Sequence, residues 1–314
     1  MSKLNDRLIQ YCITNNPFTN VYGLARTLLA LSTFLLFLFN RSNWLFRPAQ
    51  GVPEIDITHN LIYKFSLFGL LSDHLEIARW IAVLLMLIVM SGWRPRITGL
   101  IHFWVACSVF NDAMVLDGGE QVLTVITLIL LPVTLMDNRK WHWSTPETHP
   151  DSTSYLYRSM CAHIFLTFAR LQLAMIYVQA AIERLKNPEW QDGTATYYFF
   201  QVPMLGMTDS MKAIVNPILT SPAVFYITWG TTVVELLLAF GFLAQKKRWK
   251  FFLVAGILLH FGIALLLGLW TFSLTMSACL IISYVPEEKM LAFKWVRKWF
   301  ARKSYPVQLE NNPA

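Results

Sequence analysis

The stretch FFLVAGILLHFGIALLLGLWTFSLTMSACLIISYV, which is residues Phe251–Val285, is a continuous apolar run. A single helix of this length would be about 52 Å long, whereas the hydrocarbon core of a bilayer is only about 30 Å thick. Two helices of about 17 residues would each fit the bilayer and would form a tight hairpin. Gly268 and Thr271 are weak places for the turn between them. We therefore expect this run to cross a membrane twice.

Earlier apolar runs also have lengths that suit membrane-spanning helices. These runs are residues 21–40, 75–92, 97–115, 120–136, 161–185 and 223–244. The 314-residue chain is 55% hydrophobic and only 14% charged, whereas soluble domains are nearer a quarter charged. The sequence predicts an all-α fold, a polytopic integral membrane bundle of about eight transmembrane helices. We expect a single domain over residues 1–314, with the bundle at 16–285.

The charges between the spans predict the orientation. Basic residues cluster in loops 93–96, 137–158 and 245–250 and in the tail 289–303, whereas loop 112–119 is acidic. Because positive loops stay on the cytoplasmic side, both termini are expected to be cytoplasmic. The net charge of +7 therefore indicates attraction to lipid headgroups of the bilayer, and no nucleic-acid partner is expected.

Two segments outside the spans are predicted to be ordered. Residues 186–222 form a long aromatic loop, expected to be a structured extracytoplasmic cap. Residues 288–303 place apolar side chains at helical spacing opposite lysines and arginines, which predicts an interfacial amphipathic helix. The polar N-terminus followed by the long first span does not fit a cleavable signal peptide.

Known catalytic motifs are absent from the sequence. It contains no His-Glu-x-x-His, no Gly-x-Ser-x-Gly and no phosphate-binding glycine loop, which argues against a zinc protease, a serine hydrolase of that kind and an ATP-driven pump. The four cysteines show no close pairing and indicate neither a disulfide framework nor a metal site.

Arg170, Glu235 and His260 each lie inside a long apolar run. Ionisable groups at bilayer depth are costly and usually mark function or pair within the bundle. Counting residues from the span ends places all three near one depth, so we expect Arg170 to pair with Glu235 and His260 to lie close by. The alternative is a structural ion pair that orients two helices.

A polar stripe follows one face of the fifth span, at Gln172, Gln179 and Glu183. The stripe could line a water-filled pocket that opens outward. Interhelical hydrogen bonding is the alternative interpretation.

Several motifs resemble a known family. They are the opening stretch Asn16–Arg26 (NPFTNVYGLAR), Gly118–Gln121 (GGEQ) and Leu171–Tyr177 (LQLAMIY). The chain resembles the sporulation-delaying protein B (SdpB) family over nearly its whole length. The later motifs are shared with the horizontally transferred transmembrane (HTTM) domain group, which is similar to the membrane part of vitamin K-dependent gamma-carboxylase.

The first resemblance implies a multi-pass protein of the bacterial cytoplasmic (inner) membrane that is needed for maturation of a secreted antimicrobial peptide toxin. In that family the membrane protein works with a small partner protein of the SdpA type and with the peptide precursor. The resemblance and the outer segments together suggest a substrate pocket. Its candidate residues are Gln172, Tyr177, Gln179, Glu183, Arg184, Trp190, Tyr197, Tyr198 and Glu120.

The carboxylase resemblance is partial. The position of the carboxylase lysine base falls on Arg184, which stays protonated and cannot act as that base; Lys186 is two residues away. His260 matches a functional carboxylase histidine, with Phe272-Ser273 following, whereas a second such histidine would fall near Glu120, where this chain has none. A quinone cofactor is implied only by this resemblance.

These observations leave three functions open. The first is the maturation factor, the second is a carboxylase-like or quinone-coupled membrane enzyme, and the third is a non-catalytic binder, transporter or immunity protein. For the enzyme, the candidate catalytic residues are His260, Glu235, Arg170 and Lys186.

Overall fold

A computed structural model describes residues 2–46, 61–144, 152–202, 205 and 207–291. Within these residues every regular element is a helix, and the only β-type contact is an isolated bridge between Trp93 and Trp141. The predicted all-α membrane bundle is therefore confirmed. Six of the described helices are long and apolar enough to cross a membrane.

The long helices coincide with the predicted spans. They are α2 (Asn20–Phe39), α6 (Leu75–Ser91), α7 (Pro95–Asp112), α8 (Gly118–Met136), α9 (Thr153–Arg184), α13 (Ala223–Phe240), α14 (Trp249–Leu267) and α15 (Trp270–Tyr284). Helix α9 has 32 residues and begins eight residues before the predicted span at 161–185. The number of crossings and the cytoplasmic placement of both termini stay predictions.

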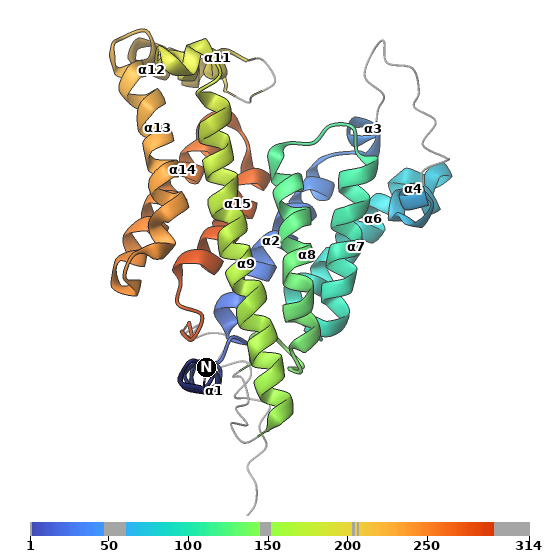
Figure 1. Cartoon of the computed structure of the whole chain (residues 1–314). Coiled ribbons are helices and arrows are strands. Elements are labelled where there is room, and N and C mark those ends of the chain that lie inside the picture. The colour runs from blue at the N-terminus through green and yellow to red at the C-terminus, as the bar shows by residue number, and fades with distance from the viewer. Residues whose placement is uncertain (1, 47–60, 145–151, 203–204, 206, 292–314) are drawn as a thin grey trace, which may run out of the picture.

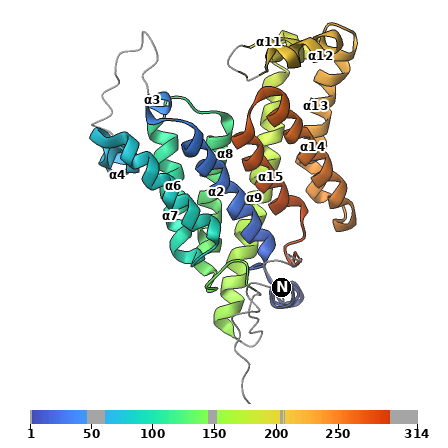
Figure 2. The same ribbon diagram turned by 180° about the vertical axis from the view of Figure 1, so that it is seen from behind.

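The bundle has two groups of helices that meet at α2, α9 and α15 (Figures 1 and 2). Helices α6, α7 and α8 lie on one side, and the pair α13 and α14 lies on the other. Helix α15 packs against α2, α8, α9 and α14 and so joins the groups.

The last two helices form the hairpin that the sequence predicts. Helix α14 ends at Leu267, Gly268 follows with a φ of 74°, and α15 begins at Trp270. A positive φ is a conformation that glycine adopts without steric cost, so Gly268 fits this turn.

The other helices of the described residues are shorter. They are α1 (Ser2–Thr14), α3 (Ser42–Leu45), α4 (Leu61–Phe65), α5 (Leu67–Leu70), α10 (Pro188–Gln191), α11 (Ala195–Gln201), α12 (Asp209–Leu219) and the 3-10 turns η2 (Ser72–His74), η3 (Gly241–Leu243) and η4 (Lys246–Arg248). The described part of segment 186–222 thus contains α10, α11 and α12. Helices α11 and α12 share an apolar cluster around Phe200, Met207 and Leu219. Helix α1 was not predicted. Residues 288–291 are not helical, and the rest of the predicted amphipathic helix lies outside the described residues.

A buried histidine fastens the loop after α8 to the first two long helices. His142 is fully buried between Gly23 and Gly92, where a Cβ on Gly23 would lie 2.9 Å from its ring. Burial, followed by the charges of Arg26 and Arg139, holds the pKa of His142 well below its usual range. The neutral ring can therefore accept a hydrogen bond at Nδ1, which lies 3.2 Å from the Arg26 guanidinium.

Candidate functional site

A buried ion pair joins the end of α9 to α13. The guanidinium of Arg184 lies 2.6 Å from the Glu235 carboxylate, and the Glu235 side chain is only 5% exposed. The Arg184 guanidinium also stacks on the Trp190 ring, 4.5 Å from its centroid. Arg184 is thus held between a carboxylate on one helix and an aromatic ring on α10, and both contacts satisfy its charge.

A phenol–imidazole hydrogen bond lies on the same face of α9. Tyr177 Oη lies 2.9 Å from His260 Nε2, and both side chains are buried. The Phe272 ring packs edge-on against His260, with centroids 5.5 Å apart, and Ser273 Oγ donates to the His260 carbonyl at 2.6 Å. His260 Nδ1 is buried and has no hydrogen-bond partner among the described residues.

We name Tyr177, Arg184, Glu235 and His260 the core polar cluster. Tyr177 and Arg184 are seven residues apart on α9, so their side chains leave the same face of the helix. Chemically, the phenol and imidazole can exchange a proton, and the guanidinium can bind an anionic or carbonyl oxygen. From the sequence, His260 and Glu235 were candidate catalytic residues, and Tyr177 and Arg184 were candidate pocket residues; the structure brings all four into this cluster.

The predicted pairing of Arg170 with Glu235 is wrong. Arg170 Nη2 instead lies 2.8 Å from Glu287 Oε2, and Glu235 pairs with Arg184. Arg170 is 14 residues before Arg184 on α9, a rise of about 21 Å, so one carboxylate cannot serve both. The depth of Arg170 could not be read correctly from the sequence because α9 extends further than the predicted span. Its actual partner, Glu287, lies beyond the last apolar run.

The remaining predicted site residues are spread over several environments. Lys186 pairs with Glu183 at 2.7 Å on the exposed surface, and Gln179 is also exposed. The outward-opening pocket along the polar stripe stays a prediction. Gln172 and Tyr197 are half-buried, and Tyr198 is exposed. Their roles stay predictions.

Glu120 is buried at the start of α8. Its carboxylate accepts the backbone N–H of Asp117 at 3.1 Å, while Asp117 accepts from the backbone at the start of the helix. This reciprocal arrangement is a capping box, which stabilises a helix N-terminus. Its contacts give Glu120 a structural role at this position.

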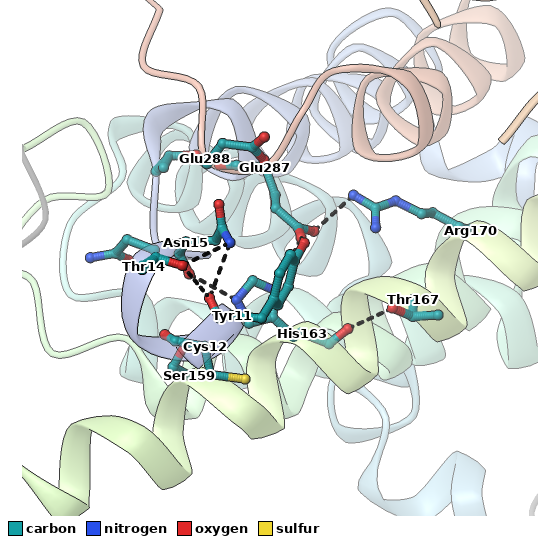
Figure 3. A network of polar contacts seen from close by, with 12 residues as sticks. Tyr11, Cys12, Thr14, Asn15, Ser159, His163, Thr167, Arg170, Glu287 and Glu288 are labelled. Carbon is teal, nitrogen blue, oxygen red and sulfur yellow. Dashed lines mark hydrogen bonds and ion pairs between the residues drawn. The ribbon is translucent and has the colours of Figure 1, made fainter. Parts of the chain in front are cut away.

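A second polar group, which we name the inner cluster, lies where α1, α9 and the segment after α15 meet (Figure 3). It consists of Tyr11, His163, Arg170 and Glu287. Burial raises the pKa of Glu287, but hydrogen bonding to His163 and the charge of Arg170 outweigh it and lower this pKa to about 2. Only Arg170 of this cluster was singled out from the sequence. Two sequence features could have pointed to the other members of the cluster. His163 lies near the start of an apolar run, and Glu287 lies just after the last one.

Among the described residues, no three His, Cys, Asp or Glu side chains are grouped so that they could hold a metal ion.

Comparisons with known proteins identify relatives along nearly the whole chain. No family model and no solved structure matches it. The chain is 37% identical over 293 residues to the uncharacterized protein YitO of Bacillus subtilis (strain 168), covering 92% of this chain and 93% of YitO. It is 36% identical over 301 residues to the sporulation-delaying protein SdpB of the same organism, covering 95% of this chain and 91% of SdpB. This helical membrane protein therefore belongs to the family of the sporulation-delaying protein SdpB.

Proposed function

We propose that this protein is required to produce a secreted antimicrobial peptide toxin, and that it acts on the peptide precursor together with a small partner of the SdpA type. The observation that carries the proposal is the similarity to SdpB over 95% of the chain. Because that match spans the bundle and the segment 186–222, it includes every residue of the core polar cluster. We place the protein in the bacterial cytoplasmic membrane with both termini inside.

The core polar cluster is the proposed working site. It combines a buried acid–base pair, Tyr177 and His260, with an arginine fixed by Glu235 and Trp190. Such a combination can hold a peptide carbonyl or carboxylate at the guanidinium while a proton moves at the imidazole. Buried ionisable groups in a membrane protein are costly to retain, which favours a role beyond structure.

The test is the intact mass and amount of the secreted peptide from cells with and without this protein. Deletion should abolish the mature peptide. His260→Ala should do the same at normal membrane abundance, and Glu235→Gln should do the same once the peptide yield is divided by membrane abundance. Asp209→Asn, which changes an exposed acid on α12, should leave the peptide unchanged. Mature peptide of unaltered mass and amount after deletion would refute the proposal.

A carboxylase-like or quinone-coupled enzyme is the second candidate, and the contact between Tyr177 and His260 favours it. On this hypothesis His260 moves the proton, because Arg184 is ion-paired and Lys186 lies on the exposed surface beside Glu183. A gain in peptide mass equal to carbon dioxide would support it, as would a quinone bound to the purified protein. Production that needs the protein but survives every cluster variant would instead favour a non-catalytic binder.

A further inference from the structure

Helix α12 is amphipathic and presents different kinds of side chain in different directions. The side chains that pack on the bundle recur at every fourth position; they are Met211, Val215 and Leu219. Ile214 and Ile218 lie one turn apart along one edge of this packed face, and they are 73% and 49% exposed. The side chains along the opposite edge are polar; they are Asp209, Lys212 and Asn216. The described residues therefore leave an apolar edge of α12 largely uncovered.

The packing of α12 places it at one edge of the hydrocarbon layer. The apolar cluster that α12 joins also contains Val224 and Ile227 from the first turns of α13, and Leu266 and Leu267 from the end of α14. Helix α14 has 19 residues and a length of about 28 Å, and the basic turn η4 directly precedes it. Since the hydrocarbon core is about 30 Å thick, the start of α14 lies near one interface and its end lies near the other. Helix α12 therefore lies at the depth of the second interface.

Exposed aromatic side chains gather at the same end of the bundle. Figures 1 and 2 show α11 and α12 together at this end, opposite the end at which α1 lies. Tyr198 and Phe199 of α11 are exposed, and so is Tyr226 in the first turn of α13. Tyrosine and tryptophan concentrate at membrane–water interfaces, because their rings are apolar and carry a polar group. The side chains of this surface are therefore of the kind that suits an interface.

We propose that α12 lies in the membrane–water interface at this end of the bundle, with Ile214 and Ile218 inserted among the lipid acyl chains and Asp209 directed toward water. An amphipathic helix in this position buries its apolar side about 5–10 Å into the boundary between headgroups and acyl chains. Lys212 lies on the polar edge, where its ammonium can reach lipid phosphates. The segment 186–222 is then partly immersed in lipid and is not a cap that stands clear of the membrane.

Continuity with the lipid-facing surface favours the bilayer as the occupant of this edge. Val233 and Leu237 are exposed on α13, a helix that is long and apolar enough to cross the membrane, so lipid already surrounds α13. Only residues 220–222 separate the end of α12 from the start of α13. The apolar edge of α12 therefore begins within one short turn of a surface that lipid covers. A protein or peptide partner is required only if this edge faces water.

A fluorescent probe on α12 tests the depth of each edge. The full chain, with its four cysteines replaced by alanine, carries Ile214→Cys or Ile218→Cys, is labelled with NBD-maleimide and is reconstituted in nanodiscs of phosphatidylglycerol and phosphatidylethanolamine. The matched control carries Asp209→Cys, at an exposed position on the polar edge of the same helix. Quenching is measured with lipids that carry a nitroxide near the headgroup end of the acyl chain, and separately with aqueous iodide.

The ratio of nitroxide quenching to iodide quenching should be severalfold higher at Ile214→Cys and at Ile218→Cys than at Asp209→Cys, because only the apolar edge is immersed. The two positions report independently, so the loss of one variant through misfolding still leaves a reading from the other. A ratio no higher than that of the control, at either position in a folded variant, would overturn the proposal. Such a result would show that this edge faces water, where a protein or peptide partner could cover it.

Discussion

Tyr177 and Arg184 leave one face of α9 two turns apart, and each contacts a different helix of the neighbouring pair. Tyr177 meets His260 on α14 at 2.9 Å, and Arg184 meets Glu235 on α13 at 2.6 Å. One face of α9 therefore fixes both helices of the α13–α14 pair by polar contacts. We therefore expect a substitution that breaks one of these contacts to weaken the other.

Glu235→Gln should destabilise the protein because it leaves the Arg184 charge without its carboxylate. Breaking a buried pair costs about 3–5 kcal/mol, and the partial exposure of Arg184 places the expected loss at the low end. Glu183→Gln is the matched control, because it breaks an exposed pair with Lys186 that is worth about 0–1 kcal/mol. Thermal unfolding in detergent measures both. Equal losses in the two variants would contradict the assignment of a buried pair.

Tyr177→Phe should separate function from stability. It removes the hydroxyl that meets His260 and keeps the ring, so the expected cost in stability is about 1–3 kcal/mol for an unsatisfied buried nitrogen. Peptide production should fall much further, at least tenfold, if proton transfer through this contact is required, since general acid–base catalysis contributes about 10²–10⁴-fold. The check is peptide yield divided by membrane abundance. A yield that only follows abundance would assign Tyr177 a structural role.

Gly23→Ala should destabilise the bundle because the added methyl would lie 2.9 Å from the His142 ring and 3.0 Å from its carbonyl oxygen. Overpacking of this kind costs about 1–3 kcal/mol. Gly262→Ala on α14 is the control, since no heavy atom lies within 4 Å of the added Cβ. It should leave stability unchanged or raise it by roughly 0.5–1 kcal/mol, as alanine replaces glycine within a helix. The two melting temperatures should therefore shift in opposite directions or by clearly different amounts.

Glu287→Gln should have an effect that depends on pH. The lowered pKa of Glu287, about 2, means that its ionised form contributes stability above its ordinary pKa, and that this contribution is lost as pH falls toward 2. At pH 7 the variant should be less stable than the wild type by about 3 kcal/mol. The difference should stay constant down to about pH 4.5 and shrink below it. Unfolding curves of both proteins from pH 7 to pH 3 measure this, and a difference that grows with falling pH would contradict it.

The helices could be predicted because their apolar runs have the length that a bilayer requires. The break at Gly268 follows from the same argument, since one helix over Phe251–Val285 would be too long. Helix α1 could not be predicted in this way. It is polar and amphipathic, and its position depends on Tyr11 and Cys12 meeting residues more than a hundred positions away.

The sequence identified ionisable residues that belong to the polar sites, but it did not identify the residues that they pair with. Arg170, Glu235 and His260 stand out because charges are rare in apolar runs. The depth of Arg170 was counted from residue 161, whereas α9 begins at Thr153, and Glu235 meets Arg184, about 21 Å further along the helix. Glu287 follows Pro286 outside the apolar runs, so nothing in the sequence marks it as the partner of Arg170.

The buried contact between His142 and Arg26 also has a consequence for the order in which the helices assemble. Arg26 precedes His142 by 116 residues, so its guanidinium enters the membrane helix α2 long before its acceptor has been synthesised. Thr98 Oγ1, 3.0 Å from Arg26 Nη2, arrives in between. We expect chains stalled before residue 142 to leave α2 more accessible to protease than chains stalled after residue 144. The N-terminal helices would then close around a buried charge before α9, and with it the core polar cluster, leaves the ribosome.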